Sequence, residues 1–255
     1  MSARPTADGE RSPSQARSAG ALFLIPVPLG GDDAAAVLPS AVQLVARQMD
    51  CYVAESAKAA RRVLKLLGVT RPLRQIPIEE LNEHTAQHRL PSLIQPALTG
   101  SRVGLLSEAG CPAVADPGAT LVRLAHQHGV RVVPLVGPSS LMLALMASGL
   151  NGQRFHFHGY LPANQAARVQ ALREMESDPR LTGAAQIFIE TPYRNRQLFG
   201  SIIATCRDST QLCIATDLTL ATESIETKPV VEWHRITPDL EHRPTVFILQ
   251  AGEAG

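Results

Sequence analysis

The 255-residue chain carries almost no net charge and few cysteines, and both scarcities restrict what it can be. The formal net charge is +1 with the histidines neutral, so no general basic field attracts nucleic acid or an anionic membrane. Any contact with RNA would therefore need a local basic patch. The four cysteines form neither a CxxC pair nor a zinc-binding spacing, which predicts reduced thiols, no bound metal and a cytoplasmic location.

Long apolar runs and the familiar nucleotide-binding motifs are also missing. No run approaches the ~18 apolar residues that a membrane-spanning helix requires, and the N-terminal segment lacks the apolar core of a signal peptide. The first apolar run ends in PVPLGGDD, which matches neither GxGxxG nor GxxxxGK[ST], and HExxH and GxSxG do not occur. The sequence therefore predicts a protein without a membrane-spanning segment, and no single motif identifies its chemistry.

The most informative stretch, residues 103–140, has the pattern of a βαβ unit. Apolar β-type runs at residues 103–106 and 130–136 each end in a turn of small residues, SEAG and GPSS. About a dozen residues of helical pattern, with Asp116 as the expected N-cap, separate the two runs, as in neighbouring parallel strands. Small residues just past strand ends let a ligand approach the backbone, and open α/β sheets bind cofactors in such crevices.

Strand-like and helix-like segments alternate along the chain, which predicts an α/β protein. Strands are expected at residues 22–27, 51–54, 103–106, 130–136, 154–160, 185–190, 211–215, 230–236 and 244–250. Helices are expected at residues 39–48, 56–67, 117–128, 141–147, 169–176 and 193–206, with a broken or short helix at residues 89–98.

The domain organisation follows from changes of composition along the chain. Residues 1–20, rich in Ser, Ala, Arg and Pro, are expected to form a disordered tail. A change in character near residues 137–152 predicts two α/β domains, residues 21–137 and 138–255.

An ordered series of short motifs resembles one known family. The series PVPLGG, AESAK, NEH, SEAGCPAVADPG, VVPLVGPSS, FHGYLP and IETPYR extends over nearly the whole ordered chain. It is similar to the tetrapyrrole methylase superfamily, and within it to the ribosomal RNA small subunit methyltransferase I branch and its shorter paralogues. Where the family has KGE late in the chain, this sequence has Arg243-Pro244-Thr245, and it lacks the family's lysine-rich loop after the FLP-type motif.

The resemblance implies a fold, a cofactor and a set of cofactor-binding residues. The fold would have a mostly parallel N-terminal sheet, a mixed C-terminal sheet and a cleft between them that binds S-adenosylmethionine, usually within a homodimer. Carried over by position, the cofactor-binding residues are Leu29, Ser107, Glu108, Ala109, Gly110, Val114, Ser139, Ser140, Tyr160, Leu161, Thr191, Leu218, Pro244 and Thr245.

Methyl transfer needs alignment and exclusion of water above all, and a base only where the acceptor is hard to deprotonate. A ribose hydroxyl is such an acceptor, and the candidates for the base are Glu55, His84 and Glu190, each within a matched motif. Each has another interpretation: Glu55 as a helix cap, His84 as a polar loop residue, and Glu190 as an ion-pair partner of an arginine at 194 or 196. The pair His156 and His158 on one strand face could bind a metal, but no third ligand is apparent, so we expect none.

Three functions remain open. The first is ribose 2'-O-methylation of a cytidine in small-subunit rRNA, with a basic rim that would contact the RNA, made of Lys58, Arg61, Arg62, Arg168 and Arg173. The second is methylation of a small-molecule or tetrapyrrole acceptor, and the third is binding of S-adenosylmethionine without catalysis. The missing lysines weaken the rRNA assignment specifically, because phosphate contacts dominate affinity for RNA.

Overall fold

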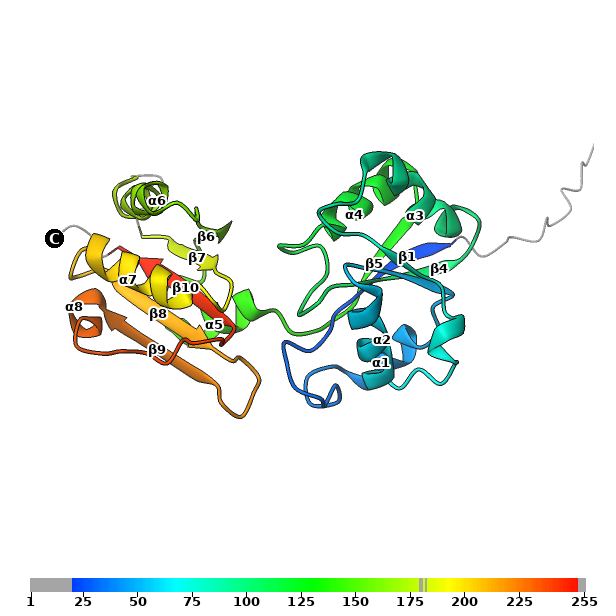
Figure 1. The fold of residues 1–255 in the computed structure, drawn as a ribbon, viewed down its shortest axis with the longest axis horizontal. Coiled ribbons are helices and arrows are strands. Elements are labelled where there is room, and N and C mark those ends of the chain that lie inside the picture. Colours follow the sequence, from blue (N-terminus) through cyan, green and yellow to red (C-terminus); the bar gives the residue numbers. More distant parts are fainter. Residues whose placement is uncertain (1–19, 179–180, 182, 252–255) are drawn as a thin grey trace, which may run out of the picture.

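The computed structural model describes residues 20–178, 181 and 183–251, and their strands form two five-stranded sheets (Figure 1). The first sheet is parallel throughout, in the order β3-β2-β4-β1-β5. Its strands are β1 (Ala21–Ile25), β2 (Cys51–Ala54), β3 (Ile78–Glu80), β4 (Arg102–Leu106) and β5 (Arg131–Pro134). The tail predicted for residues 1–20 lies outside the described residues except for Gly20.

Helices cover both faces of the first sheet, α1 and α2 on one side and α3 and α4 on the other (Figure 1). Alternate strand residues point to the two sides, so Ile25 and Tyr52 belong to one apolar cluster and Leu22 and Val53 to the other. A sheet buried on both faces explains why its strands are almost continuously apolar. The helices are α1 (Ser40–Ala46), α2 (Ala57–Leu66), α3 (Leu90–Leu98) and α4 (Gly118–Gln127), with 3₁₀ turns η1 (Leu73–Gln75) and η2 (Gln87–Arg89).

Helix α2 presents two opposite faces. Its buried residues Ala60, Val63 and Leu64 recur at the spacing of one helical face and pack onto the sheet. Ser56 caps the helix by accepting a hydrogen bond from the Ala59 N–H at 3.4 Å, so the cap is Ser56 and not Glu55, which the sequence analysis had considered for this role. The outward face is therefore free to carry charged side chains.

The second sheet is mixed, in the order β6-β7-β10-β8-β9, with β6 and β7 parallel and the other neighbours antiparallel. Its strands are β6 (Phe155–Tyr160), β7 (Ala185–Ile189), β8 (Gln211–Thr216), β9 (Ser224–Pro229) and β10 (Thr245–Gln250). Helices α6 (Gln165–Ser177), α7 (Asn195–Thr205) and α8 (Val230–Trp233) pack on one face, and α5 (Ser140–Ser148) packs on the other. The parallel first sheet and the mixed second sheet confirm the predicted fold class, whereas a domain boundary at residue 137 stays a prediction.

The structure differs from the predicted elements in two respects. The strand expected at residues 230–236 is wrong, because α8 begins at Val230 so that Trp233 can bury its ring and donate its Nε1–H to the Leu212 carbonyl at 3.0 Å. Strands β3 and β9 were not predicted; both are edge strands with polar residues. Of the two forms expected at residues 89–98, the structure has the short helix: α3 is nine residues long, with Pro91 in the first turn, where no intrahelical N–H bond is needed, and Pro96 inside the helix.

None of the helices in the described part of the chain combines the length and the apolar character needed to cross a bilayer.

Candidate active site

A cavity of about 520 Å³ lies between the two sheets. Leu29 follows β1, Glu55 follows β2 and Ser107 follows β4, so the first-sheet wall is made at the carboxyl ends of parallel strands. From the second sheet, Leu218 follows β8 and Thr245 begins β10. Open α/β sheets bind ligands at the carboxyl ends of their parallel strands, so this cavity is the candidate active site.

The turn after β4 is fixed to the loop after β1. Gly110 and Val27 exchange two backbone hydrogen bonds of 2.9 and 3.1 Å, and the Ser107 hydroxyl donates to the Ala109 and Gly110 carbonyls. Gly110 has a φ of 72°, which favours glycine, and a Cβ there would come within 3.2 Å of the Leu29 side chain. Main-chain groups therefore form this wall and are held in place before any ligand enters.

Unusual backbone conformations concentrate around the cavity. All the non-glycine residues with positive φ in the described ranges lie in its loops or beside them: Ala113, Ala115, Asp217, Thr219 and His242. Asp116 holds the first two by accepting hydrogen bonds from the N–H groups of Ala113, at 2.9 Å, and Gly118, at 2.7 Å. Such conformations persist only where the surroundings impose them, and they cluster at functional sites.

The cavity is lined by carboxylates, namely Glu55, Glu108, Asp116, Glu190 and Asp217. Burial, and then the negative charges of Asp116 and Glu108, raise the pKa of Glu55 above its ordinary value of 4.5. Burial also raises the pKa of the Tyr160 hydroxyl, and the charges of Glu190, Glu55 and Glu108 raise it further. The cavity is thus a negative environment that favours a cationic ligand.

The structure brings two of the three candidate bases to the cavity. Glu55 and Glu190 line it, but His84 does not: its side chain is 85% exposed and lies 3.5 Å from Glu83. Glu190 is nearly fully buried, and its Oε1 accepts hydrogen bonds from the Thr191 N–H at 2.7 Å and from Arg194 at 2.6 Å. The predicted ion pair of Glu190 is thereby confirmed with Arg194.

All the predicted cofactor-binding residues line the cavity except Leu161 and Thr191. Leu161 belongs to the apolar cluster under the second sheet, and Thr191 contacts Glu190 through its backbone. The lining residues that the sequence analysis missed are Cys111, Ala115, Asp116, Leu141, Phe157, Ile189, Pro192, Ala215, Asp217, Leu220 and Val246. Asp217 and Leu220 lie in the turn after β8 on either side of Leu218, which was predicted, so the sequence neighbours of Leu218 were the signal that could have found them.

Comparison with known proteins places this arrangement in a family. No family model matches the chain. It is 33% identical over 215 residues to "Ribosomal RNA small subunit methyltransferase I" of Escherichia coli O157:H7, a match that covers 84% of this chain and 71% of the relative. The chain belongs to the ribosomal RNA small subunit methyltransferase I family.

Solved structures agree with this family at the level of the fold. The methyltransferase CobJ is 16% identical with a TM-score of 0.61, covering 92% of this chain and 97% of its own. Uroporphyrin-III-C-methyltransferase from Thermus thermophilus is 16% identical with a TM-score of 0.54, covering 91% and 92%. The family member described here therefore has the predicted tetrapyrrole-methylase-like fold, and it is a methyltransferase.

The basic rim predicted for this methyltransferase is partly wrong. Arg168 is 2% exposed, and its guanidinium donates to the Ser201 hydroxyl and to the Pro162 and Ala163 carbonyls. It therefore holds α6 against α7 and offers no charge to a ligand. The exposed cations nearest the cavity lie on α2: Lys58, Arg61, Arg62 and Lys65.

The histidine pair on β6 has ring centroids 6.4 Å apart, and the Nε2 of His158 is 2.7 Å from the Gln186 side-chain oxygen. No group of three or more His, Cys, Asp and Glu side chains suited to a metal ion occurs among the residues that the structure describes.

Proposed function

We propose that this methyltransferase transfers the methyl group of S-adenosylmethionine to a ribose 2'-hydroxyl of a cytidine in small-subunit rRNA, in the cytoplasm. The observation that carries the proposal is the cavity between the sheets, where the SEAG and GPSS turns meet Glu55 and Glu190. The name of the Escherichia coli O157:H7 relative, ribosomal RNA small subunit methyltransferase I, supports the choice of acceptor.

The residues of the cavity fit this methyl donor. S-adenosylmethionine supplies an electrophilic methyl group on a positively charged sulfonium, and Glu108 and Asp116 provide negative charge for a cation. The Ser107–Gly110 turn and the Ser139-Ser140 turn offer backbone N–H and C=O groups to polar atoms, and Leu29 and Leu218 offer apolar surface to the adenine. Tyr160, Val114, Pro244 and Thr245 complete the proposed donor site, and Leu161 and Thr191 would support it from behind.

Glu55 is the proposed general base. It is half-buried and lines the cavity, its carboxylate accepts a hydrogen bond from the backbone of Glu108 in the same cavity, and no ion pair within the described residues holds it elsewhere. Its raised pKa makes its carboxylate a stronger proton acceptor than an ordinary glutamate. The carboxylate would accept the proton of the acceptor hydroxyl while the hydroxyl oxygen bonds to the methyl carbon and the bond from that carbon to the sulfonium sulfur breaks, which leaves S-adenosylhomocysteine. Glu190, neutralised by Arg194, is better suited to holding the cavity wall.

The outward face of α2 is the proposed contact for RNA phosphates. Lys58, Arg61, Arg62 and Lys65 follow the i, i+3, i+4, i+7 spacing of one helical face, are exposed, and have no carboxylate partner within the described residues. A second hollow, of about 500 Å³, lies between α2 and the loop after β1, and it shares Leu29 and Glu108 with the main cavity. Unpaired cations beside this second hollow would bind the phosphates of an RNA acceptor and orient it toward the cavity.

A homodimer is proposed on the exposed face of α5. The helix is apolar around its whole circumference, yet Met146 is 76% exposed and Val136, just before the helix, is 72% exposed. A helix that is apolar on all sides is normally buried, so we propose that a second copy of the chain covers this face. Sedimentation should then give twice the monomer mass, and Met146→Lys should yield monomers.

The decisive assay uses small ribosomal subunits from a strain that lacks its own copy of this enzyme. Incubation with S-adenosylmethionine labelled in the methyl group should label small-subunit rRNA, and nuclease digestion should release 2'-O-methylcytidine. Large subunits serve as the control acceptor. Label in a tetrapyrrole or another small molecule instead would overturn the proposed acceptor, and donor binding without any turnover would leave a non-catalytic binding protein.

A further inference from the structure

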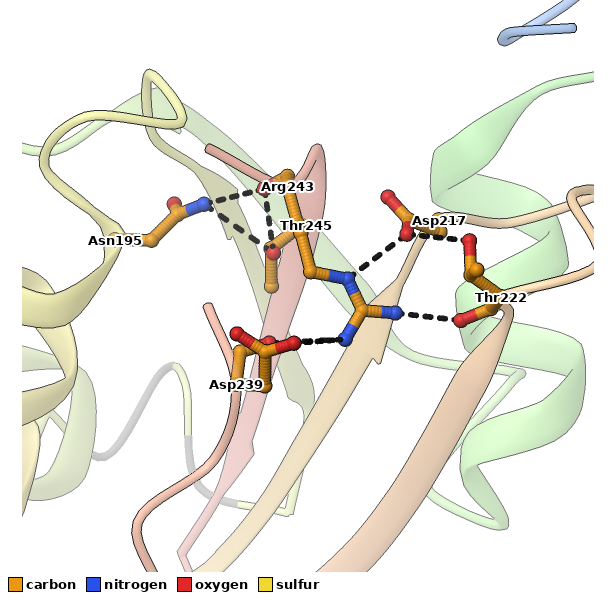
Figure 2. Close-up of polar contacts among 6 residues, drawn as sticks. All are labelled: Asn195, Asp217, Thr222, Asp239, Arg243 and Thr245. Atoms are coloured by element: carbon orange, nitrogen blue, oxygen red, sulfur yellow. Dashed lines mark hydrogen bonds and ion pairs between the residues drawn. The ribbon is translucent and has the colours of Figure 1, made fainter. Parts of the chain in front are cut away.

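Arg243 joins the two turns that form the second-sheet wall of the cavity (Figure 2). Its Nε donates to the Asp217 carboxylate at 2.8 Å, and one terminal nitrogen donates to the Thr222 carbonyl. The other terminal nitrogen donates to Asp239, to the backbone carbonyl at 3.1 Å and to the carboxylate at 3.3 Å. One guanidinium therefore connects the turn after β8 with the loop that precedes β10.

Asp217 and Arg243 are both shielded from water, with side chains 10% and 20% exposed. Asp217 also accepts a hydrogen bond from the Thr222 hydroxyl at 2.7 Å, and its backbone N–H donates to the Pro244 carbonyl at 2.9 Å. Low exposure keeps solvent from screening this ion pair, unlike pairs on the open surface. The network thus fixes the backbone at both ends of the wall.

The backbone of the wall needs such support. Asp217, Thr219 and His242 have φ values of 53°, 72° and 58°, a region that β-branched threonine in particular disfavours. Asn195, buried on α7, donates its amide to the Arg243 carbonyl at 2.7 Å and to the Thr245 hydroxyl at 3.2 Å (Figure 2). Without these contacts the turns would relax to commoner conformations.

We infer that Arg243 is a positioning residue for the methyl-donor site, through the Asp217 turn and through Pro244 and Thr245. Leu218, Leu220, Pro244 and Thr245 line the cavity, whereas Arg243 does not, so it acts through them. The inference rests on the proposed function. It also gives a reason for an arginine where the family pattern has the lysine of KGE, since the three nitrogens of a planar guanidinium reach separate partners that the single nitrogen of a lysine would have to share.

The test compares Arg243→Gln with Arg196→Gln, which removes an equal charge from an exposed pair with Glu241 at 3.5 Å. Calorimetric titration should show the Kd for S-adenosylhomocysteine raised about tenfold by Arg243→Gln, since hydrogen bonds to charged groups carry that much free energy. Arg243→Lys should recover part of the affinity, and Arg196→Gln should bind as the wild type does. In methyl transfer, the KM for the donor should rise while kcat at saturating donor stays near the wild-type value.

A double-mutant cycle separates positioning from general loss of structure. If the two side chains act as one unit, the double variant with Asp217→Asn and Arg243→Gln loses less binding free energy than the sum of the losses in the two single variants. Strict additivity, or a wild-type Kd for Arg243→Gln, overturns the inference. A wild-type protein that fails to bind S-adenosylhomocysteine overturns the proposed function instead. A variant that merely unfolds would lower the fraction of binding-competent protein, which the titration stoichiometry reports separately from Kd.

Discussion

Leu220 lies so close to Gly30 that a Cβ on the glycine would sit 3.1 Å from the Leu220 Cδ1 atom. Gly30 belongs to the loop after β1 of the first sheet, and Leu220 belongs to the turn after β8 of the second. Leu220 lines the cavity between the sheets, and Gly30 lines the second hollow beside it, so the contact joins the two walls next to the cavity. A residue without a side chain at position 30 is therefore what lets the two walls approach.

Replacing Gly30 by alanine should loosen this contact. Leu220 would have to shift by a few tenths of an ångström, and we expect the Kd for S-adenosylhomocysteine to rise about fivefold, equivalent to about 1 kcal/mol of overpacking. The matched control is Gly152→Ala, because a Cβ there meets nothing within 4 Å and the backbone has no positive φ. Equal affinities for both variants in calorimetric titration would show that the contact does not shape the donor site.

Glu55→Gln should separate catalysis from stability. The folded state raises the pKa of Glu55, so folding disfavours its charged form; this carboxyl supports stability below pH 4.5 and that support is lost as pH rises through the raised pKa. Urea unfolding should therefore find Glu55→Gln at least as stable as the wild type at pH 7, with the difference fading toward pH 4.

The same substitution should lower kcat by about 100-fold if Glu55 is the general base. The wild-type kcat should fall as pH falls through the raised pKa, because protonated Glu55 cannot accept a proton. Glu83→Gln, at an 86% exposed side chain outside the cavity, is the control and should leave kcat unchanged. An unchanged kcat in Glu55→Gln would exclude this residue as the base.

Arg194→Ala should destabilise the fold through Glu190. The Glu190 carboxylate is 1% exposed and would lose its only cationic partner within the described residues, which costs about 2 kcal/mol in the free energy of unfolding. Arg196→Ala removes an exposed pair and should cost less than about 0.5 kcal/mol. Chemical denaturation of both variants measures these losses. Equal losses of unfolding free energy would show that the buried pair contributes no more to stability than the exposed pair.

Removing cations from α2 should weaken RNA binding and leave the affinity for the methyl donor unchanged. For Arg62→Gln combined with Lys65→Gln, the slope of log K against log salt should fall by about 1 per lost phosphate contact, with S-adenosylhomocysteine affinity unchanged. Arg123→Gln, exposed on α4 across the sheet, is the control with the same kind of change (Figure 1). If the wild type, the α2 double variant and Arg123→Gln all show the same salt slope, α2 does not contact the RNA phosphates.

The sequence predicts well those elements whose pattern is local. Strand β4 and the SEAG turn follow from an apolar run and small residues, and the start of α2 follows from the helical pattern that begins at residue 56. Most residues of the proposed donor site could be predicted to lie together because motifs at strand ends occur in the order of the family, and the fold brings those ends to one cavity.

What the sequence could not predict depends on long-range contacts. The apolar run at Val230 resembles a strand, but burial of Trp233 against β8 makes it helical. An arginine is normally a surface residue, and only the hydrogen bonds of Arg168 to Ser201 on α7 and to the Pro162 and Ala163 carbonyls before α6 explain its burial. Arg243 shares no local pattern with Asp217, and the pair forms only because β8 and β10 are neighbours in the second sheet.

Binding of the methyl donor tests the account most directly. Thermal unfolding should be followed with S-adenosylmethionine and S-adenosylhomocysteine, with NAD and GTP as controls. Ligand at about 100 times its Kd adds about 2.7 kcal/mol to the stability of the folded state, which shifts Tm by several degrees. Only the two adenosyl ligands should give this shift; no shift, or an equal shift with NAD or GTP, would contradict the proposed binding of the methyl donor.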